Sequence, residues 1–154
     1  LYPDGEIIAA QVCEENNIPY ILSTMSICSI EEISKNVTSP FWFQLYVMKD
    51  KEFITNLISR AKAAKCSALV ITMDLPVLGQ RHQDLRNGLS APPKLSLSHI
   101  IQLIQRPGWC VRMTRTKNRT FGNILGHAKN VNDLSSMVKW THDQFDQGLS
   151  WSYI

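Results

Sequence analysis

The sequence predicts an α/β fold with parallel strands, and two observations support this prediction. Three apolar runs, at residues 20–23, 41–46 and 68–74, alternate with amphipathic segments of helical length. Strands that alternate with helices are the pattern of βαβ units, whose right-handed crossovers place neighbouring strands parallel. Each run also ends on a polar side chain, which is where a parallel α/β enzyme carries its chemistry. The sequence therefore predicts a sheet whose strand ends form a polar site.

The first unit is a helix followed by a strand. Residues 5–17 are expected to form an amphipathic helix that ends before Pro19. Its apolar side is predicted to comprise Ile8, Ala9 and Val12. A short apolar strand follows at residues 20–24.

The second unit repeats this order. Ser29 is the expected N-cap of a short helix, and Glu32, three residues later, completes a capping box. Residues 36–40 are a predicted loop. The strand at 41–47 is apolar except for Gln44, as expected of a strand that is buried on both faces.

The third unit begins after Asp50 with a helix and continues with a strand at residues 68–73. The apolar positions of the helix recur with helical spacing. They are Phe53, Leu57, Ile58, Ala61 and Ala64.

Two architectures fit such a sheet, an open doubly wound sheet and a closed (β/α)8 barrel of the TIM type. The sequence contains neither G-x-G-x-x-G nor G-x-x-x-x-G-K-[ST], the motifs that would favour a nucleotide-binding open sheet, so we favour the barrel. Such a barrel takes eight strands and about 250 residues. We therefore expect residues 1–154 to be a partial barrel within a single domain, with βα units at 1–84 and a long loop and helix excursion at 85–150.

The excursion is basic. Residues 85–132 contain eight Lys or Arg side chains and no Asp or Glu, so this tract could meet an anionic membrane surface, an acidic partner or solvent. A helical stripe is predicted to end at Pro107 and Gly108, and we favour its packing on the barrel over a membrane-seeking role. Asn132 or Asp133 is expected to cap a last helix. The stripe comprises Leu97, Ile100, Ile101 and Ile104.

Composition limits the compartment and the chemistry. With 44% hydrophobic and 19% charged residues the chain has the content of a globular domain. No apolar stretch reaches 18 residues and the start lacks the layout of a signal peptide. The four cysteines form no C-x-x-C pair, so we expect reduced thiols, no disulfide framework, no metal site and a cytoplasmic location.

The strand ends supply the candidate site. Tyr46 and Asp74 end two of the apolar runs, and Arg81 follows in a loop, so a pocket there would suit a small anionic substrate. The alternatives are that these polar side chains simply face solvent and that Asp74 is a turn cap. The neutral members of the same pocket are Ser23, Gln44 and Thr72.

Three strings closely resemble the FMN-dependent 2-hydroxy-acid dehydrogenases and oxidases. They are L-S-T-M-S-I-C-S-I-E-E-I, W-F-Q-L-Y-V-M-K-D and T-M-D-L-P-V-L-G-Q-R-H-Q-D-L-R-N. Later blocks, G-N-I-L-G-H, D-L-S-S, W-T-H-D-Q-F-D and L-S-W, resemble the bacterial L-lactate dehydrogenase branch. The resemblance implies an eight-stranded barrel with FMN across its carboxyl-terminal mouth. It implies that Ser23, Gln44 and Thr72 hydrogen-bond the flavin.

The resemblance also implies roles for three further residues. Tyr46 would hydrogen-bond the substrate, Arg81 would lie near the substrate carboxylate, and Asp74 would orient a histidine base. In the family that base lies in a later H-G-x-R motif, which this sequence does not contain. None of the chain's own histidines is assigned the role. They are His82, His99, His127 and His142.

The implied reaction of the full-length enzyme is FMN-dependent oxidation of an L-2-hydroxy acid. Met25, where glycolate oxidases tend to carry an aromatic residue, favours L-lactate, which would give pyruvate. The alternatives are a glycolate-type oxidase and a non-catalytic truncated barrel that lacks the base. The implied partners are an electron acceptor such as a quinone or respiratory chain and other copies of the chain, with no nucleic acid. The basic tract is consistent with peripheral contact at the inner membrane.

Overall fold

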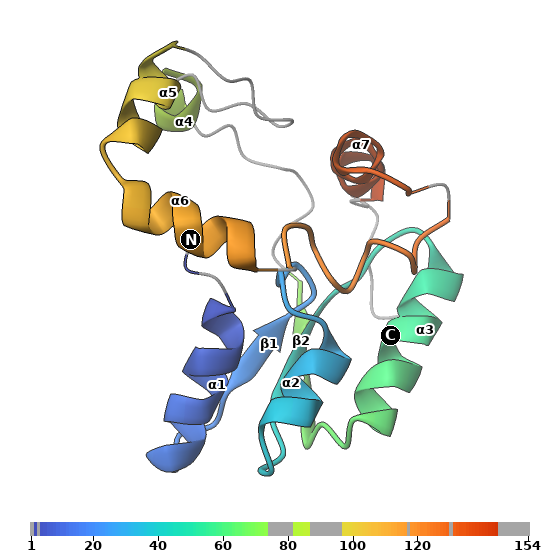
Figure 1. Ribbon diagram of the computed structural model, residues 1–154. Coiled ribbons are helices and arrows are strands. Elements are labelled where there is room, and N and C mark those ends of the chain that lie inside the picture. The colour runs from blue at the N-terminus through green and yellow to red at the C-terminus, as the bar shows by residue number, and fades with distance from the viewer. Residues whose placement is uncertain are drawn as a thin grey trace.

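Three parallel strands form the centre of the structure, β1 (Ile21–Ser23), β2 (Trp42–Tyr46) and β3 (Ala68–Thr72) (Figure 1). The computed structural model describes residues 2, 4–73, 82–86, 97–116, 118–129 and 131–144. In this part of the chain the strand order is β1-β2-β3 and both pairings are parallel. The predicted parallel sheet is confirmed.

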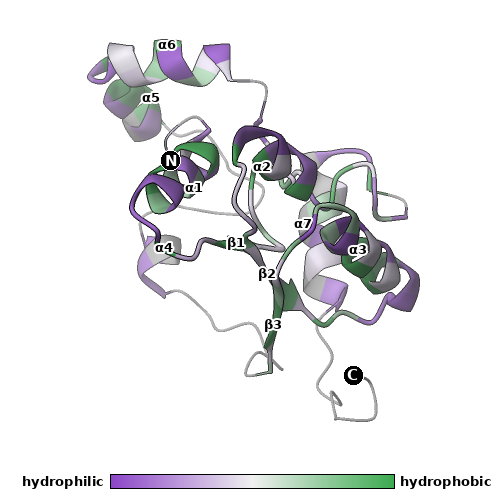
Figure 2. Cartoon of the chain, turned by 90° about the horizontal axis from the view of Figure 1, so that it is seen from below, coloured by the Kyte–Doolittle hydropathy of each residue, from purple (hydrophilic) through white to green (hydrophobic). Residues whose placement is uncertain are grey.

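Three helices cover one face of this sheet, α1 (Gly5–Glu15), α2 (Ile30–Asn36) and α3 (Lys51–Ala63), as the view in Figure 2 shows. Right-handed crossovers between neighbouring strands place successive helices on the same side, which accounts for this layering. Leu22, Phe43 and Leu45 point from the strands into the core between sheet and helices and are at most 2% exposed. None of these three helices lies over the opposite face of the sheet.

The helix α1 packs through a different face from the predicted one. Ile8 and Val12 are 44% and 50% exposed, whereas Ala10 is buried. Glu6 and Glu14 lie one helical turn before and one after Ala10, and their carboxylates accept hydrogen bonds from neighbouring loops. Because these carboxylates bind backbone N–H groups, this face is turned inward and the predicted apolar face remains outside.

The caps of α2 and α3 follow the sequence signals. Ser29 Oγ accepts from Glu32 N at 3.2 Å and Glu32 Oε2 accepts from Ser29 N at 2.7 Å, so the predicted capping box is confirmed. Asp50 caps α3 by accepting from Phe53 N at 3.0 Å. The buried stripe of α3 comprises Phe53, Leu57 and Ala61, while Ile58, which was expected on it, is 41% exposed.

The strand β2 is buried on one face only. Phe43 and Leu45 point to the helices, whereas Trp42, Gln44 and Tyr46 are half-buried on the opposite face. The expected burial on both faces is therefore wrong for the described part of the chain. The half-buried face is the one that carries the polar strand ends.

The excursion contains α4 (His82–Arg86), α5 (Leu97–Ile104) and α6 (Pro107–Arg115). In Figure 1, α5 and α6 lie at the end of the molecule toward which the strands run. The prediction that the apolar stripe of α5 packs on the barrel is wrong, because Leu97 is 81% and Ile104 72% exposed. The stripe does end before Pro107, but this proline occupies the first turn of α6 and so starts a further helix.

The chain then returns to the core and ends its described part in α7 (Leu134–Gln144). Ile124 is completely buried, and Met137 of α7 is 1% exposed. Asp133 Oδ1 accepts from Ser136 N at 2.7 Å, which confirms one of the two predicted caps. The ring of Trp140 meets Phe53 edge to face with centroids 4.9 Å apart. The late segment thus shares one core with the βα units.

Truncation of Ile124 tests whether the returning segment belongs to this core. Ile124→Ala should lower the free energy of unfolding by about 2–5 kcal/mol, because it leaves a cavity among buried side chains. The control is Ile101→Ala, which shortens a side chain that is 56% exposed and should change stability by at most about 0.5 kcal/mol. Urea denaturation of the full-length gene product measures both. Equal effects of the two substitutions would contradict the shared core.

Candidate functional site

Four polar side chains gather at the carboxyl ends of the strands, on the face of the sheet opposite to α1, α2 and α3. Ser23 ends β1, Gln44 and Tyr46 lie on β2, and Thr72 ends β3. The register places Ser23 beside Gln44 and Tyr46 beside Thr72. Since side chains two residues apart share a face of a strand, all four face the same side. The predicted gathering of these residues is confirmed.

A continuous hydrogen-bond chain links three of these residues across the three strands. Ser23 Oγ donates to Gln44 Oε1 at 2.8 Å, and Gln44 Nε2 donates to Thr72 Oγ1 at 2.8 Å. Met25 N donates to Ser23 Oγ at 3.1 Å, which fixes the first hydroxyl. We call Ser23, Gln44 and Thr72 the neutral row, because these three hydrogen-bonded side chains are two hydroxyls and an amide, none of which is charged.

Thr24, next to the neutral row, is a residue that sequence reasoning did not select. It is completely buried, and its Oγ1 donates to Gln44 O at 2.7 Å and accepts from Tyr46 N at 3.2 Å. These bonds extend the pairing of β1 and β2 past the end of β1. Side chains of a strand point alternately to its two faces, so the inward Leu22 and outward Ser23 were the one available signal that Thr24 points inward.

Behind the row, on the helix side, Arg60 of α3 binds Glu31 of α2. Arg60 Nε and Nη2 donate to the two carboxylate oxygens of Glu31 at 2.7 and 2.8 Å. Arg60 is 11% exposed, and its guanidinium also contacts Asn123 of the returning segment. The hydrogen bond from Arg60 lowers the pKa of Glu31 to about 2. The pair thus joins two helices and the segment 118–129.

The buried Cys28 and the half-buried Cys66 are poor candidates for nucleophiles. Burial and the neighbouring Glu6 carboxylate raise the pKa of Cys28 to about 12, and burial raises that of Cys66 to about 11. A thiol with such a pKa is protonated at neutral pH, whereas the thiolate is the reactive form. All four cysteines are free thiols. In the described ranges, no group of three or more His, Cys, Asp and Glu side chains is arranged to bind a metal ion.

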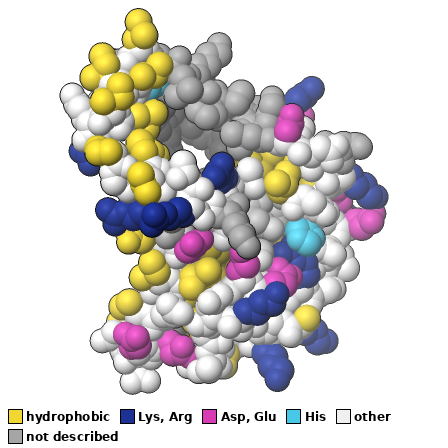
Figure 3. Space-filling model, in the orientation of Figure 1, with side chains coloured by type: hydrophobic (Ala, Val, Ile, Leu, Met, Phe, Trp, Pro, Cys, Tyr) yellow, Lys and Arg dark blue, Asp and Glu magenta, His cyan; other side chains and the backbone are white. Residues whose placement is uncertain are grey.

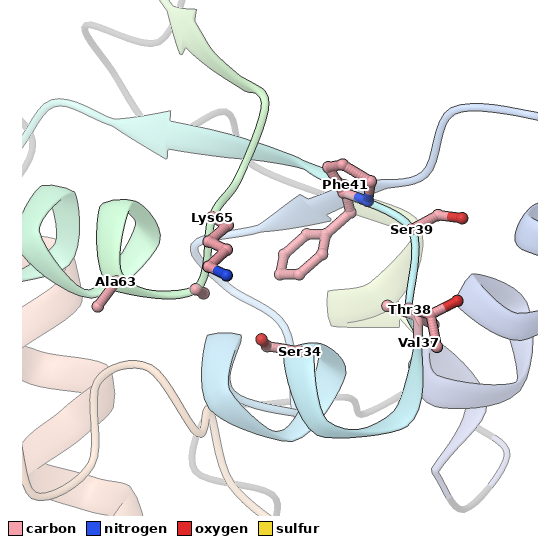
Figure 4. A pocket seen from close by; sticks show the side chains of 9 residues that line it. Ser34, Val37, Thr38, Ser39, Phe41, Ala63 and Lys65 are labelled. Carbon is pink, nitrogen blue, oxygen red and sulfur yellow. The ribbon is translucent and has the colours of Figure 1, made fainter.

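A separate cavity of about 310 Å³ opens at the amino-terminal ends of β2 and β3 (Figure 4). Ser34, Phe41 and Lys65 are among its lining residues. Active sites of parallel α/β proteins lie at the carboxyl ends of the strands. The cavity lies at the opposite end from the neutral row, so we do not assign it to the same site.

Two predicted site residues, Asp74 and Arg81, lie outside the described residues, and their roles stay predictions. His127 is exposed by surface area, but nearby protein removes part of the water around its ring, and this desolvation together with the Arg60 charge lowers its pKa. It contributes to a cavity of about 100 Å³ with Asp50 and Lys129. This histidine is therefore not a member of the polar group at the strand ends.

Comparison with known proteins gives the family. The model of the FMN-dependent dehydrogenase family matches residues 1–154. The chain belongs to this family. It is 39% identical over 148 residues to an L-lactate dehydrogenase of Haemophilus influenzae (strain PittEE) and 40% identical to one of Actinobacillus pleuropneumoniae serotype 5b (strain L20). Each alignment covers 96% of this chain and 39% of the relative, so the chain spans about two fifths of these curated proteins.

A solved structure confirms the fold. The crystal structure of the monotopic membrane protein (S)-mandelate dehydrogenase matches with a TM-score of 0.87 and 27% identity, over 99% of this chain and 40% of that one. The expected family resemblance and the partial TIM barrel are both confirmed. The neutral row therefore lies at the carboxyl ends of the strands of a partial TIM barrel.

Acid should weaken the Arg60–Glu31 pair. A carboxyl whose folded pKa lies near 2 rather than 4.5 stabilises the folded state above about pH 4.5, and this contribution is lost as pH falls toward 2. Glu31 is 44% exposed, so solvent screening limits the contribution to about 1 kcal/mol. The difference in melting temperature between wild type and Glu31→Gln should shrink between pH 4.5 and pH 2.5. The control, Lys35→Gln on the same helix, should keep the wild-type acid dependence. A difference that does not change with pH would contradict the assignment.

Proposed function

We propose that this chain forms part of an FMN-dependent enzyme that oxidises an L-2-hydroxy acid, with L-lactate, which gives pyruvate, as the favoured substrate. The observation that carries the proposal is the neutral row at the carboxyl ends of three parallel strands. The relatives named L-lactate dehydrogenase support the choice of substrate.

The neutral row fits a flavin ring. Gln44 uses one N–H and one lone pair of its amide within the row, and an amide group has two of each. The edge of an isoalloxazine ring carries both donors and acceptors, which hydroxyl and amide groups match without adding charge. We assign Ser23, Gln44 and Thr72 to FMN binding. Bound FMN would supply the acceptor for the hydrogen on C2 of the substrate, which no side chain of this chain can supply.

The other side chains at this end bind and orient the substrate in our proposal. Tyr46 is half-buried beside Thr72, where its phenol can hydrogen-bond the substrate. Arg81 pairs with the substrate carboxylate, for which the guanidinium offers charge and a forked pair of donors. Asp74 orients the histidine that takes the hydroxyl proton. We assign that histidine to a position outside these 154 residues.

Matched substitutions separate cofactor binding from substrate binding. Gln44→Leu removes the centre of the neutral row and should raise the Kd for FMN at least about tenfold, as expected for the loss of one or two hydrogen bonds. Tyr46→Phe should leave the Kd for FMN unchanged and lower kcat/KM for L-lactate by about 10–100-fold. Flavin fluorescence titration and anaerobic bleaching of the flavin by L-lactate or glycolate, in the full-length gene product, measure both effects.

The chain offers the same substitutions elsewhere as controls. Gln11→Leu changes an exposed glutamine of α1, and Tyr20→Phe changes a tyrosine just before β1, at the other end of the sheet. Neither should affect FMN affinity or turnover. A full-length protein that binds no FMN would refute the proposal, and faster bleaching by glycolate than by L-lactate would refute the choice of substrate.

We also propose peripheral contact with a membrane through α5 and α6. The apolar side chains of α5 form an exposed patch, with Lys and Arg side chains directly beside it (Figure 3). Arg112 and Arg115 of α6 are exposed, and residues 85–132 contain no acidic side chain.

The matching (S)-mandelate dehydrogenase is described as a monotopic membrane protein. No helix of the described ranges is long and apolar enough to cross a membrane. An amphipathic helix with basic neighbours is the pattern of interfacial binding.

Vesicle binding tests this contact. The double substitution Ile101→Asp with Ile104→Asp should reduce cosedimentation with anionic vesicles at least about tenfold, because it places charge on the apolar face. Charge reversal at Arg112 and Arg115 should weaken binding by about 1 kcal/mol or more per site at low salt. The control, Ile58→Asp, changes an exposed isoleucine of α3 and should have no effect. Unchanged binding of both test variants would refute the contact.

We further propose a quinone or another respiratory carrier as the electron acceptor, the cytoplasmic side of the inner membrane as the location, and a homo-oligomer as the assembled state. The exposed face of α5 supports the first two proposals, since it would bring the barrel to a membrane that carries such acceptors. We also propose that the chain belongs to one domain, in which residues 1–84 form the βα units and residues 85–150 form the excursion.

A further inference from the structure

Asn123 is a completely buried polar side chain in the segment that follows α6. Its amide has two lone pairs and two N–H groups, and each of the four has a partner. Oδ1 accepts from Ile30 N at 3.0 Å and from Arg60 Nη2 at 3.1 Å. Nδ2 donates to Ser26 Oγ at 3.1 Å and to Ser23 O at 3.4 Å. A buried amide that is satisfied in this way specifies one arrangement of its neighbours.

The chemistry of these partners fixes which way the amide faces. Ile30 N and the Arg60 guanidinium can only donate, so the oxygen must face them. The Ser23 carbonyl can only accept, so the nitrogen must face it. Reversing the amide would place donor against donor and acceptor against acceptor.

Asn123 itself is held from two sides. Gly122 N donates to Ser26 O and Ile27 O at 3.2 and 3.1 Å, and a Cβ at Gly122 would come within 2.6 Å of Ile27 O. Only glycine permits this close approach to the loop after β1. On the other side Arg60 Nη1 donates to Asn123 O at 3.2 Å. The amide is therefore placed by backbone contacts and by a guanidinium that is itself bound to Glu31.

The contact with Ser23 connects this cluster to the neutral row. Asn123 donates to the main-chain carbonyl of Ser23, and the side-chain hydroxyl of Ser23 donates to Gln44. Asn123 also binds Ser26, whose Oγ donates to Cys28 O at 2.6 Å within the same turn. A shift of the amide would move the Ser23 main chain and with it the first hydroxyl of the row.

We propose that Asn123 is a positioning residue that sets Ser23 in the place where it binds FMN. This inference rests on the proposed function of the neutral row. It makes the segment after α6 a structural part of the cofactor site, although Asn123 lies 100 residues from Ser23 in the sequence.

The informative variant is Asn123→Asp. The carboxylate keeps an acceptor for Ile30 N and Arg60 but has no N–H, and it places an oxygen against the Ser23 carbonyl. In the full-length gene product the Kd for FMN should rise about tenfold or more, with a changed visible circular dichroism spectrum of the bound flavin. Measurements at a temperature at which circular dichroism shows the variant apoprotein to be folded separate this effect from unfolding.

The control for stability is Met137→Ala, which shortens a buried side chain of α7 outside this hydrogen-bonded cluster. It should lower the melting temperature while changing the Kd for FMN less than about twofold. If Asn123→Asp also leaves the Kd within twofold of wild type, or if the Kd of both variants rises in step with their loss of melting temperature, the positioning role is overturned.

A second variant keeps the test decisive if Asn123→Asp does not fold. Ser26→Ala removes one of the two acceptors of Asn123 Nδ2 and should raise the Kd for FMN about threefold to fivefold. An unchanged Kd in Ser26→Ala would then overturn the proposal. Absence of FMN binding in the wild-type protein would instead overturn the proposed function, so the two failures are distinguishable.

Discussion

The side-chain amide of Gln44 is the interaction on which the mouth of the sheet depends. It lies on the central strand, accepts from Ser23 on one side and donates to Thr72 on the other. Three parallel strands could slide or splay at their free ends, where the backbone ladder stops. The amide prevents this because an oxygen and a nitrogen on one planar group require a hydroxyl at a defined distance on each flank. In the proposed function, the remaining donor and acceptor of the same planar group would bind FMN.

Charged side chains around the strand ends hold the neighbouring loops and helices in place. The carboxylates of Glu6 and Glu14 bind backbone N–H groups of the loops before and after α2, and the Thr38 hydroxyl is the main reason that the pKa of Glu14 falls to about 2. Arg60 joins α3 to Glu31 in a second charged contact. Ionised groups thus fix the loops and helices, whereas the neutral row that would meet a flavin consists of hydroxyls and an amide. Hydroxyl and amide groups can hydrogen-bond a flavin ring without adding charge to it.

Local patterns in the sequence were sufficient for the elements and insufficient for their long-range contacts. The capping box at Ser29 and the strand ends at Ser23 and Tyr46 depend on neighbours within a few residues, so they could be predicted. The inward face of α1 could not, because hydrophobic spacing ignores a carboxylate such as Glu14 that binds a loop 24 residues away. Asn123 gave no local signal either, since its partners are 63 to 100 residues distant. Family resemblance supplied the roles of Asp74 and Arg81, which spacing alone left open.

The excursion after β3 combines two kinds of surface within a short stretch of chain. On α5, Leu97 and Ile104 are exposed, so this helix gains little from packing within the chain. Some twenty residues later Asn123 and Ile124 are completely buried against the βα units. The proposed membrane contact of α5 would therefore leave the packing of the returning segment unchanged. Gly122 and Arg60 hold the returning chain on either side of Asn123, so the segment that follows α6 is bound to the βα units even though α5 is exposed.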